Sequence, residues 1–142
     1  MIIGDMQRKR EFSLKKVTDA IEAHGGTTLL STGITGDDAR FALAAVKAGA
    51  RLLEPNHPAV ALARGHRGVT TMHAAEDVRH EIAFEEMRKV VEGVRAVVGP
   101  EIFITVGVPG SFTETMHTPF TEEQAYALSR AGADSLHTHK ST

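Results

Sequence analysis

The chain contains no cysteine, so disulfide bonds, a thiolate nucleophile and metal binding through sulfur are all excluded. This absence is typical of proteins from the reducing cytoplasm, and we expect a cytoplasmic location. Tryptophan is also absent and there is a single tyrosine, which leaves little aromatic surface for stacking against bases or sugars.

Neither charge nor hydropathy favours a nucleic acid or a membrane as a partner. The formal net charge is −2, and the lysines and arginines are scattered among acidic residues, unlike the basic surface of nucleic-acid-binding proteins. No apolar run approaches the roughly 18 residues needed to cross a bilayer. The charges that follow the short apolar start are unlike a secretory signal. With 142 residues of globular composition, the chain is predicted to form a single α/β domain.

The first part, residues 1–26, is predicted to be a leading helical segment. Ser13 is the expected N-cap of a helix over residues 14–23, and Gly25 and Gly26 are expected to end it. The charged stretch at residues 6–16 is interpreted as solvated.

Beyond this segment, residues 27–142 alternate between strand-like and helix-like patterns. Because each helical crossover returns the chain to the same end of a sheet, this alternation predicts parallel strands. We expect strands at 27–32, 50–54, 69–73, 102–106 and 133–137, with a helix between most neighbours. Thr121 and Gln124 form a capping-box pattern at the start of the last helix.

An internal repeat supports a periodic architecture. Residues 48–54 and 131–137 both combine a helix end, a glycine, a short strand and a polar residue at its tip. The start points lie 131 − 48 = 83 residues apart, which is about two βα units of roughly 30–40 residues.

The Ala-Gly-Ala junction of this repeat, followed by a strand with a polar end, resembles the (β/α)8-barrel lyases, aldolases and isomerases over residues 27–139. The resemblance implies a partial (β/α)8 (TIM) barrel, the N-terminal part of a longer one, because a complete barrel needs about 200–250 residues. An incomplete barrel would expose a strand edge, so we expect a homo-oligomer. The alternative is a five-stranded flavodoxin-like open sheet.

Both folds place ligand sites at the carboxyl ends of the strands. Half of the eight histidines and two glutamates are predicted there: His57, His73, His137, His139, Glu54 and Glu76.

His137 and His139 are two residues apart on a predicted strand, so both imidazoles are expected on the same side. Such a pair can share a divalent cation, with Glu54 as the expected carboxylate ligand and His73 as a further one. This His-x-His is similar to the metal motif of some metal-dependent barrel lyases. Only His137 and His139 match that motif, and the accompanying Asp-Arg-Glu pattern is absent from the first strand. Zinc, manganese and magnesium all remain open as the predicted cofactor.

His57 or Glu76 is predicted to move protons, since imidazoles and carboxylates can act as general acids and bases, with or without a metal. Lys140 is either a Schiff-base lysine or a solvated one. The glycine-rich segment with Gly107, Gly110 and Ser111 is either an anion-binding loop or a simple turn.

Together these patterns predict a metal-assisted lyase, aldolase or isomerase that acts on a small carbonyl, phosphorylated or carboxylated metabolite. In it, a divalent ion would polarise a carbonyl and stabilise an enolate-like intermediate. The alternative hypothesis is a non-catalytic α/β module that binds a small anion or a protein partner, in which the histidines are incidental.

Overall fold

A computed structural model of the chain describes residues 2–34, 39–56, 60–61, 65–66, 84–109 and 121–139. Within these ranges, four strands form a parallel sheet in the order β1-β2-β3-β4. The strands are β1 (Ser31–Ile34), β2 (Leu52–Pro55), β3 (Phe103–Pro109) and β4 (Ser135–His139). The fold is therefore an α/β fold with a parallel sheet, as the alternating pattern predicts.

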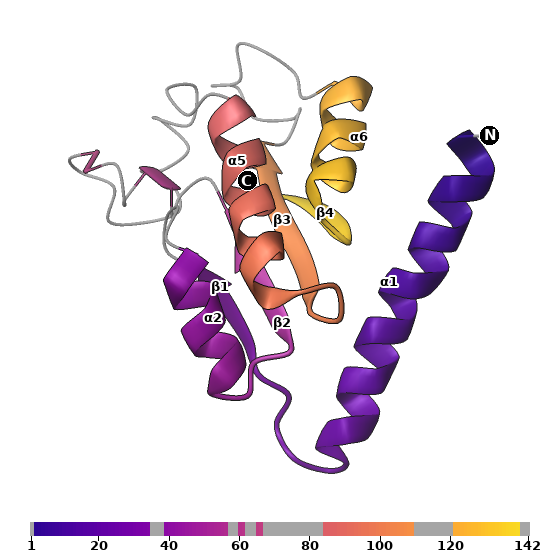
Figure 1. The fold of residues 1–142 in the computed structure, drawn as a ribbon, viewed down its shortest axis with the longest axis vertical. Helices are drawn as coiled ribbons and strands as arrows, with labels where there is room; N and C mark the ends of the chain where they lie inside the picture. Colours follow the sequence, from indigo (N-terminus) through magenta and orange to yellow (C-terminus); the bar gives the residue numbers. More distant parts are fainter. Residues whose placement is uncertain are drawn as a thin grey trace.

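Three helices cover one face of this sheet (Figure 1). They are α2 (Ala39–Lys47), α5 (Phe84–Val98) and α6 (Glu122–Ala131). Alternate strand residues point at this layer, because successive side chains of a strand face opposite sides of the sheet. Leu53, Ile104 and Val106 are fully buried there, and they meet the apolar stripe of α5 through Val91 and Val94.

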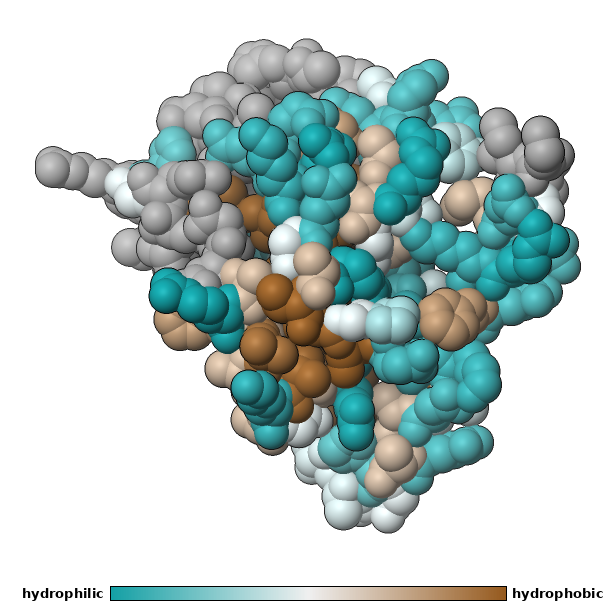
Figure 2. All heavy atoms as spheres, in the orientation of Figure 1, coloured by the Kyte–Doolittle hydropathy of each residue, from teal (hydrophilic) through white to brown (hydrophobic). Residues whose placement is uncertain are grey.

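The outer surface of the helix layer is mostly hydrophilic, as Figure 2 shows, with hydrophobic side chains gathered beside α2 and over part of α5. Phe41 of α2 and Val97 of α5 are large apolar side chains that stay exposed on these helices. The buried apolar side chains lie instead between the helices and the sheet, so the core is a single layer.

The other face of the sheet has a different character. Its residues are half-buried and mixed, and they include Leu52 and Glu54 of β2, Thr105 of β3 and His137 of β4. In the described part of the chain, β1 and β4 each pair with one neighbour only, so both sheet edges are open there.

The first helix, α1 (Ile2–His24), stands apart from the helix layer and reaches the amino-terminal ends of β3 and β4 (Figure 1). It begins well before residue 14, so the prediction that Ser13 is an N-cap is wrong. The Ser13 hydroxyl lies inside the helix and donates to the Asp134 carboxylate at 2.8 Å. The interpretation of residues 6–16 as a solvated stretch holds for most of its residues, which are exposed, but Ser13 and Lys16 are buried.

The structure confirms other predicted helices and strands, but some of their first and last residues differ. Thr121 caps α6 with a complete capping box, since Gln124 N donates to Thr121 Oγ1 at 3.2 Å and Thr121 N donates to Gln124 Oε1 at 3.0 Å. The first strand begins at Ser31 rather than at residue 27, and β3 continues to Pro109. The predicted strand at residues 69–73 lies outside the described residues.

In the parts of the chain that the structure describes, no helix is both long and apolar enough to span a membrane.

Candidate functional site

The carboxyl ends of β2 and β4 bring an acidic and an imidazole side chain together. Glu54 alternates with the buried Leu53 and Pro55, which places it on the face away from the helices. His137 lies on the same face, next to Leu136, which packs on the core instead. The two side chains therefore point to one side of the sheet from strands that flank β3.

The contact between them is direct. His137 Nε2 lies 3.2 Å from Glu54 Oε1, and the two side chains keep 31% and 33% of their surface exposed. The other ring nitrogen, His137 Nδ1, lies 3.1 Å from Thr105 Oγ1. Thr105 thus holds the imidazole ring at one edge while the opposite edge faces the carboxylate. About a third of each side chain remains accessible from solvent.

Gly107 makes this approach across β3 possible. It is the strand partner of His137 and forms an isolated bridge with Asn56. A Cβ at this position would lie 2.8 Å from Asn56 Cβ, closer than Cβ atoms approach other atoms in proteins, and 3.2 Å from His137 Nε2, a tight contact. The absence of a side chain at Gly107 therefore leaves room for the His137 imidazole. The interpretation of Gly107 as part of a loop is wrong, because Gly107 lies inside β3.

Two residues that contact Glu54 or His137 were not predicted from the sequence as site residues. Thr105 contacts the imidazole, and Asn56 Nδ2 lies 3.5 Å from Glu54 Oε1. The period-two alternation of a strand carries the missing signal, because Thr105 is two residues before Gly107 and Asn56 is two residues after Glu54.

The remaining predicted site residues are not placed beside the pair. The backbone of His139 pairs with Pro109 at the end of β4, and its side chain is outside the described part. The other predicted residues lie outside the described residues altogether: His57, His73, Glu76, Gly110, Ser111 and Lys140.

The donor atoms of Glu54 and His137 fit a divalent cation. A carboxylate oxygen and an imidazole nitrogen are ligands that zinc and manganese accept. With metal–ligand bonds of about 2.0–2.2 Å and tetrahedral angles, neighbouring ligands of one ion lie about 3.3–3.6 Å apart, slightly farther than the 3.2 Å seen here. Thr105 also provides the outer contact that usually orients a metal-binding imidazole. Within the described ranges, no group of three or more His, Cys, Asp or Glu side chains comes together.

A second polar cluster lies at the opposite end of the sheet, around Asp134. Its carboxylate is 2% exposed and accepts hydrogen bonds from Lys16, Arg95, Ser13 and the Ile104 amide, at 2.6 to 2.9 Å. Burial by itself would raise the pKa of Asp134. The hydrogen bonds from Lys16, the Ile104 amide and Ser13, with the charge of Arg95, outweigh burial and hold that pKa below its usual value.

No protein-family model matches the chain, and no curated protein matches it either.

Proposed function

We propose that this chain forms the active site of a metal-assisted lyase, aldolase or isomerase that acts on a small carbonyl-containing metabolite. The observation that carries the proposal is the Glu54–His137 contact at the carboxyl ends of parallel strands. Ligand sites of parallel α/β proteins lie at this end of the sheet.

The chain's own residues have distinct roles in this proposal. Glu54 and His137 supply an oxygen and a nitrogen ligand, and Thr105 fixes which ring nitrogen faces the carboxylate. A divalent cation bound there, zinc, manganese or magnesium, would polarise a carbonyl oxygen and stabilise negative charge on it. Asn56, which lies beside Glu54, can donate to the same substrate oxygen.

The proposed architecture is part of a (β/α)8 barrel. Its support is the sequential strand order of the sheet, in which every described pair is parallel and the strands do not reverse direction along the sheet. A flavodoxin-like sheet has a reversal in strand order and helices on both faces. The layer formed by α2, α5 and α6 lies on one face only (Figure 1).

Self-association and a cytoplasmic location belong to the same proposal. The partly exposed polar and apolar residues of the second sheet face favour pairing with another copy, and so do the edges of β1 and β4, which have no strand partner among the described residues. Sedimentation velocity over a hundredfold range of concentration checks this, and a constant monomeric coefficient would contradict it. The absence of cysteine supports the location.

A metal-free proton-transfer enzyme is the second candidate. The same direct contact favours it, since a carboxylate that orients an imidazole is a common general-base arrangement. A chelator distinguishes the two candidates: it abolishes the activity of the metal-assisted enzyme and leaves the metal-free one unchanged. A non-catalytic module that binds an anion would show neither activity nor metal uptake.

The direct experiment is equilibrium dialysis of the protein against Zn²⁺ and Mn²⁺, followed by elemental analysis. We expect about one ion per chain, and loss of that ion in Glu54→Gln and His137→Gln. His24→Gln and Glu92→Gln are matched controls, because these residues lie on α1 and α5, away from the carboxyl end of the sheet. The loaded protein is then tested for hydrogen–deuterium exchange next to the carbonyl of 2-oxo acids and phosphorylated ketones. Equal metal uptake by all variants would contradict the proposed ligands.

A further inference from the structure

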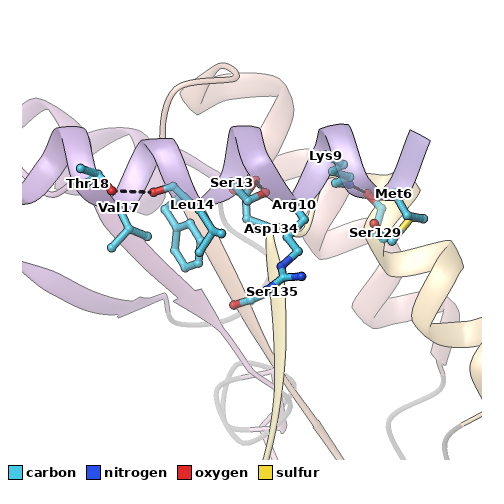
Figure 3. Close-up of a pocket in the computed structure, with 11 residues that line it drawn as sticks. Met6, Lys9, Arg10, Ser13, Leu14, Val17, Thr18, Ser129, Asp134 and Ser135 are labelled. Atoms are coloured by element: carbon cyan, nitrogen blue, oxygen red, sulfur yellow. Dashed lines mark hydrogen bonds between the residues drawn. The ribbon is translucent and has the colours of Figure 1, made fainter. Parts of the chain in front are cut away.

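A cavity of about 360 Å³ lies between α1 and the amino-terminal ends of β3 and β4, at the end of the sheet opposite Glu54 and His137 (Figure 3). Its apolar wall comes from Met6, Leu14 and Val17 of α1 and from Phe103, the first residue of β3. Its size falls within the range of roughly 300–1,000 Å³ that is usual for small-molecule sites.

The cavity exists because α1 is held by polar anchors rather than by close apolar packing. Ser13 and Lys16 bind Asp134, and Lys9 donates to the Ser129 carbonyl of α6. Apolar side chains on the same helix are left largely uncovered, with Leu14 at 56% and Met6 at 36% exposure. An apolar surface that lines a cavity and is not filled by the protein's own side chains is a place for an apolar ligand.

The charge around the cavity is positive. Lys9 and Arg10 line it together with Asp134, whose charge is already matched by Lys16 and Arg95. In the described part of the chain, no hydrogen bond or ion pair is formed by Arg10. Figure 3 shows the Arg10 side chain reaching toward Ser135 across the cavity.

Lys9 is partly buried beside the Asp134 cluster, and burial is the main cause of a lowered pKa for its amine. The charge of Asp134 acts in the opposite direction, and the nearby charges of Arg95 and Lys16 lower the pKa further. A bound anion would stabilise the charged form of this amine and would give Arg10 a partner.

We propose that this cavity binds an apolar molecule that carries one carboxylate, independently of the proposed reaction at the other end of the sheet. The carboxylate pairs with the Arg10 guanidinium, which suits two-point binding of that group, and lies near the Lys9 ammonium. The apolar body packs against Leu14, Val17 and Phe103.

The test uses octanoate as the probe, measured by its displacement of the fluorescent anion 8-anilinonaphthalene-1-sulfonate from the full chain. Octylammonium, of matched apolar length and opposite charge, is expected to compete far more weakly. Arg10→Gln is expected to weaken octanoate binding roughly fivefold, the effect of losing one exposed charge contact. Val17→Phe is expected to fill the cavity and remove binding.

Arg8→Gln is the matched control, because Arg8 lies on the same helix, pairs with Asp5 and does not line the cavity. It should bind octanoate as the unchanged protein does. Equal competition by octanoate and octylammonium, or equal weakening by Arg8→Gln and Arg10→Gln, would overturn the proposal. So would a change in sedimentation coefficient for Arg10→Gln without a change in octanoate binding, which would assign this surface to contacts between copies of the chain.

Discussion

Asp134 and His137 are three residues apart in the sequence, yet they belong to two polar clusters of opposite character. Asp134 precedes β4, and its side chain is 2% exposed among four hydrogen-bond donors. His137 lies within β4, and both it and its partner Glu54 keep about a third of their surface. A buried, fully hydrogen-bonded cluster therefore lies at the amino end of β4, and an accessible one lies towards its carboxyl end.

The cluster at the amino end has every feature of a structural one. Asp134 joins α1, α5 and the start of β3 through Lys16, Arg95 and the Ile104 amide. Arg95 also donates to the carbonyls of Gly99, Ile102 and Gly132, so it links the segment before β3 to the turn before β4. A carboxylate with this many internal donors has no capacity left for a ligand.

The cluster at the carboxyl end is more accessible, because Glu54 and His137 each keep about a third of their side-chain surface exposed. Glu54 and His137 can exchange their contact for a ligand without leaving a charge buried and unpaired, because water reaches both side chains. Solvent exposure and the number of internal hydrogen bonds, rather than the presence of a charged pair, therefore distinguish a binding site from a structural contact.

The largest effect is expected for Asp134→Asn. The substitution leaves Lys16 buried without its anion, and breaking a buried ion pair in this way costs about 3 kcal/mol or more. Urea unfolding at neutral pH measures the loss. Asp19→Asn is the control, since Asp19 pairs with Lys15 on the exposed side of α1, and its unfolding midpoint should not move. Equal shifts for the two variants would refute the structural role of the Asp134 cluster.

The acid dependence of stability should come largely from the same carboxylate. Because the folded-state pKa of Asp134 is below its usual value, its contribution is present above the unfolded-state pKa of about 4 and is lost as the pH falls through the lower folded value. Urea midpoints of the unchanged chain and of Asp134→Asn should therefore converge as the pH is lowered from 7 to 3. A constant gap between them over this range would contradict the assignment.

An intermediate effect is expected for Gly107→Ala. The new methyl group would meet Asn56 and the His137 imidazole, and overpacking of this kind costs about 1–3 kcal/mol. Gly93→Ala is the matched control, because Gly93 lies in α5 with open space at its Cβ and should gain roughly 0.5–1 kcal/mol from helix propensity. Thermal unfolding of both variants gives the comparison, and destabilisation of both by the same amount would argue against a specific clash at Gly107.

The smallest effect on stability is expected for Glu54→Gln and His137→Gln. A half-exposed pair contributes less than about 1 kcal/mol, so both variants should unfold close to the unchanged chain in the absence of metal. Urea titration of chelator-treated protein checks this. A loss as large as that of Asp134→Asn would make the carboxyl-end pair a structural contact and would remove the contrast between the two ends.

Local sequence patterns predicted that Glu54 and His137 lie at the carboxyl end of the sheet, but not their contacts with Thr105 and Asn56. The repeat that begins at Ala48 and Ala131 predicts that Glu54 and His137 occupy equivalent strand tips, and the two side chains meet in the structure. The Thr121 capping box depends only on residues of one helical turn, and it is confirmed for the same reason.

The amino-end cluster could not be predicted, because its contacts join residues far apart in the chain. Lys16 and Asp134 are 118 positions apart, and Ser13 and Asp134 are 121 apart. Seen alone, the basic residues near Ser13 are indistinguishable from a solvated face, and a serine before an apolar run is indistinguishable from a helix cap. Only the docking of α1 on the sheet reveals their partner.

The most direct test of the account is the urea unfolding midpoint measured with and without Zn²⁺ or Mn²⁺ for three proteins: the unchanged chain, Asp134→Asn, and the double variant Glu54→Gln/His137→Gln. A metal at a hundred times its dissociation constant stabilises the folded state by about 2.7 kcal/mol. We expect that gain in the unchanged chain and in Asp134→Asn, despite the lower starting stability of the latter, and no gain in the double variant. Equal gains in all three proteins, or none in the unchanged chain, would contradict a metal site formed by Glu54 and His137.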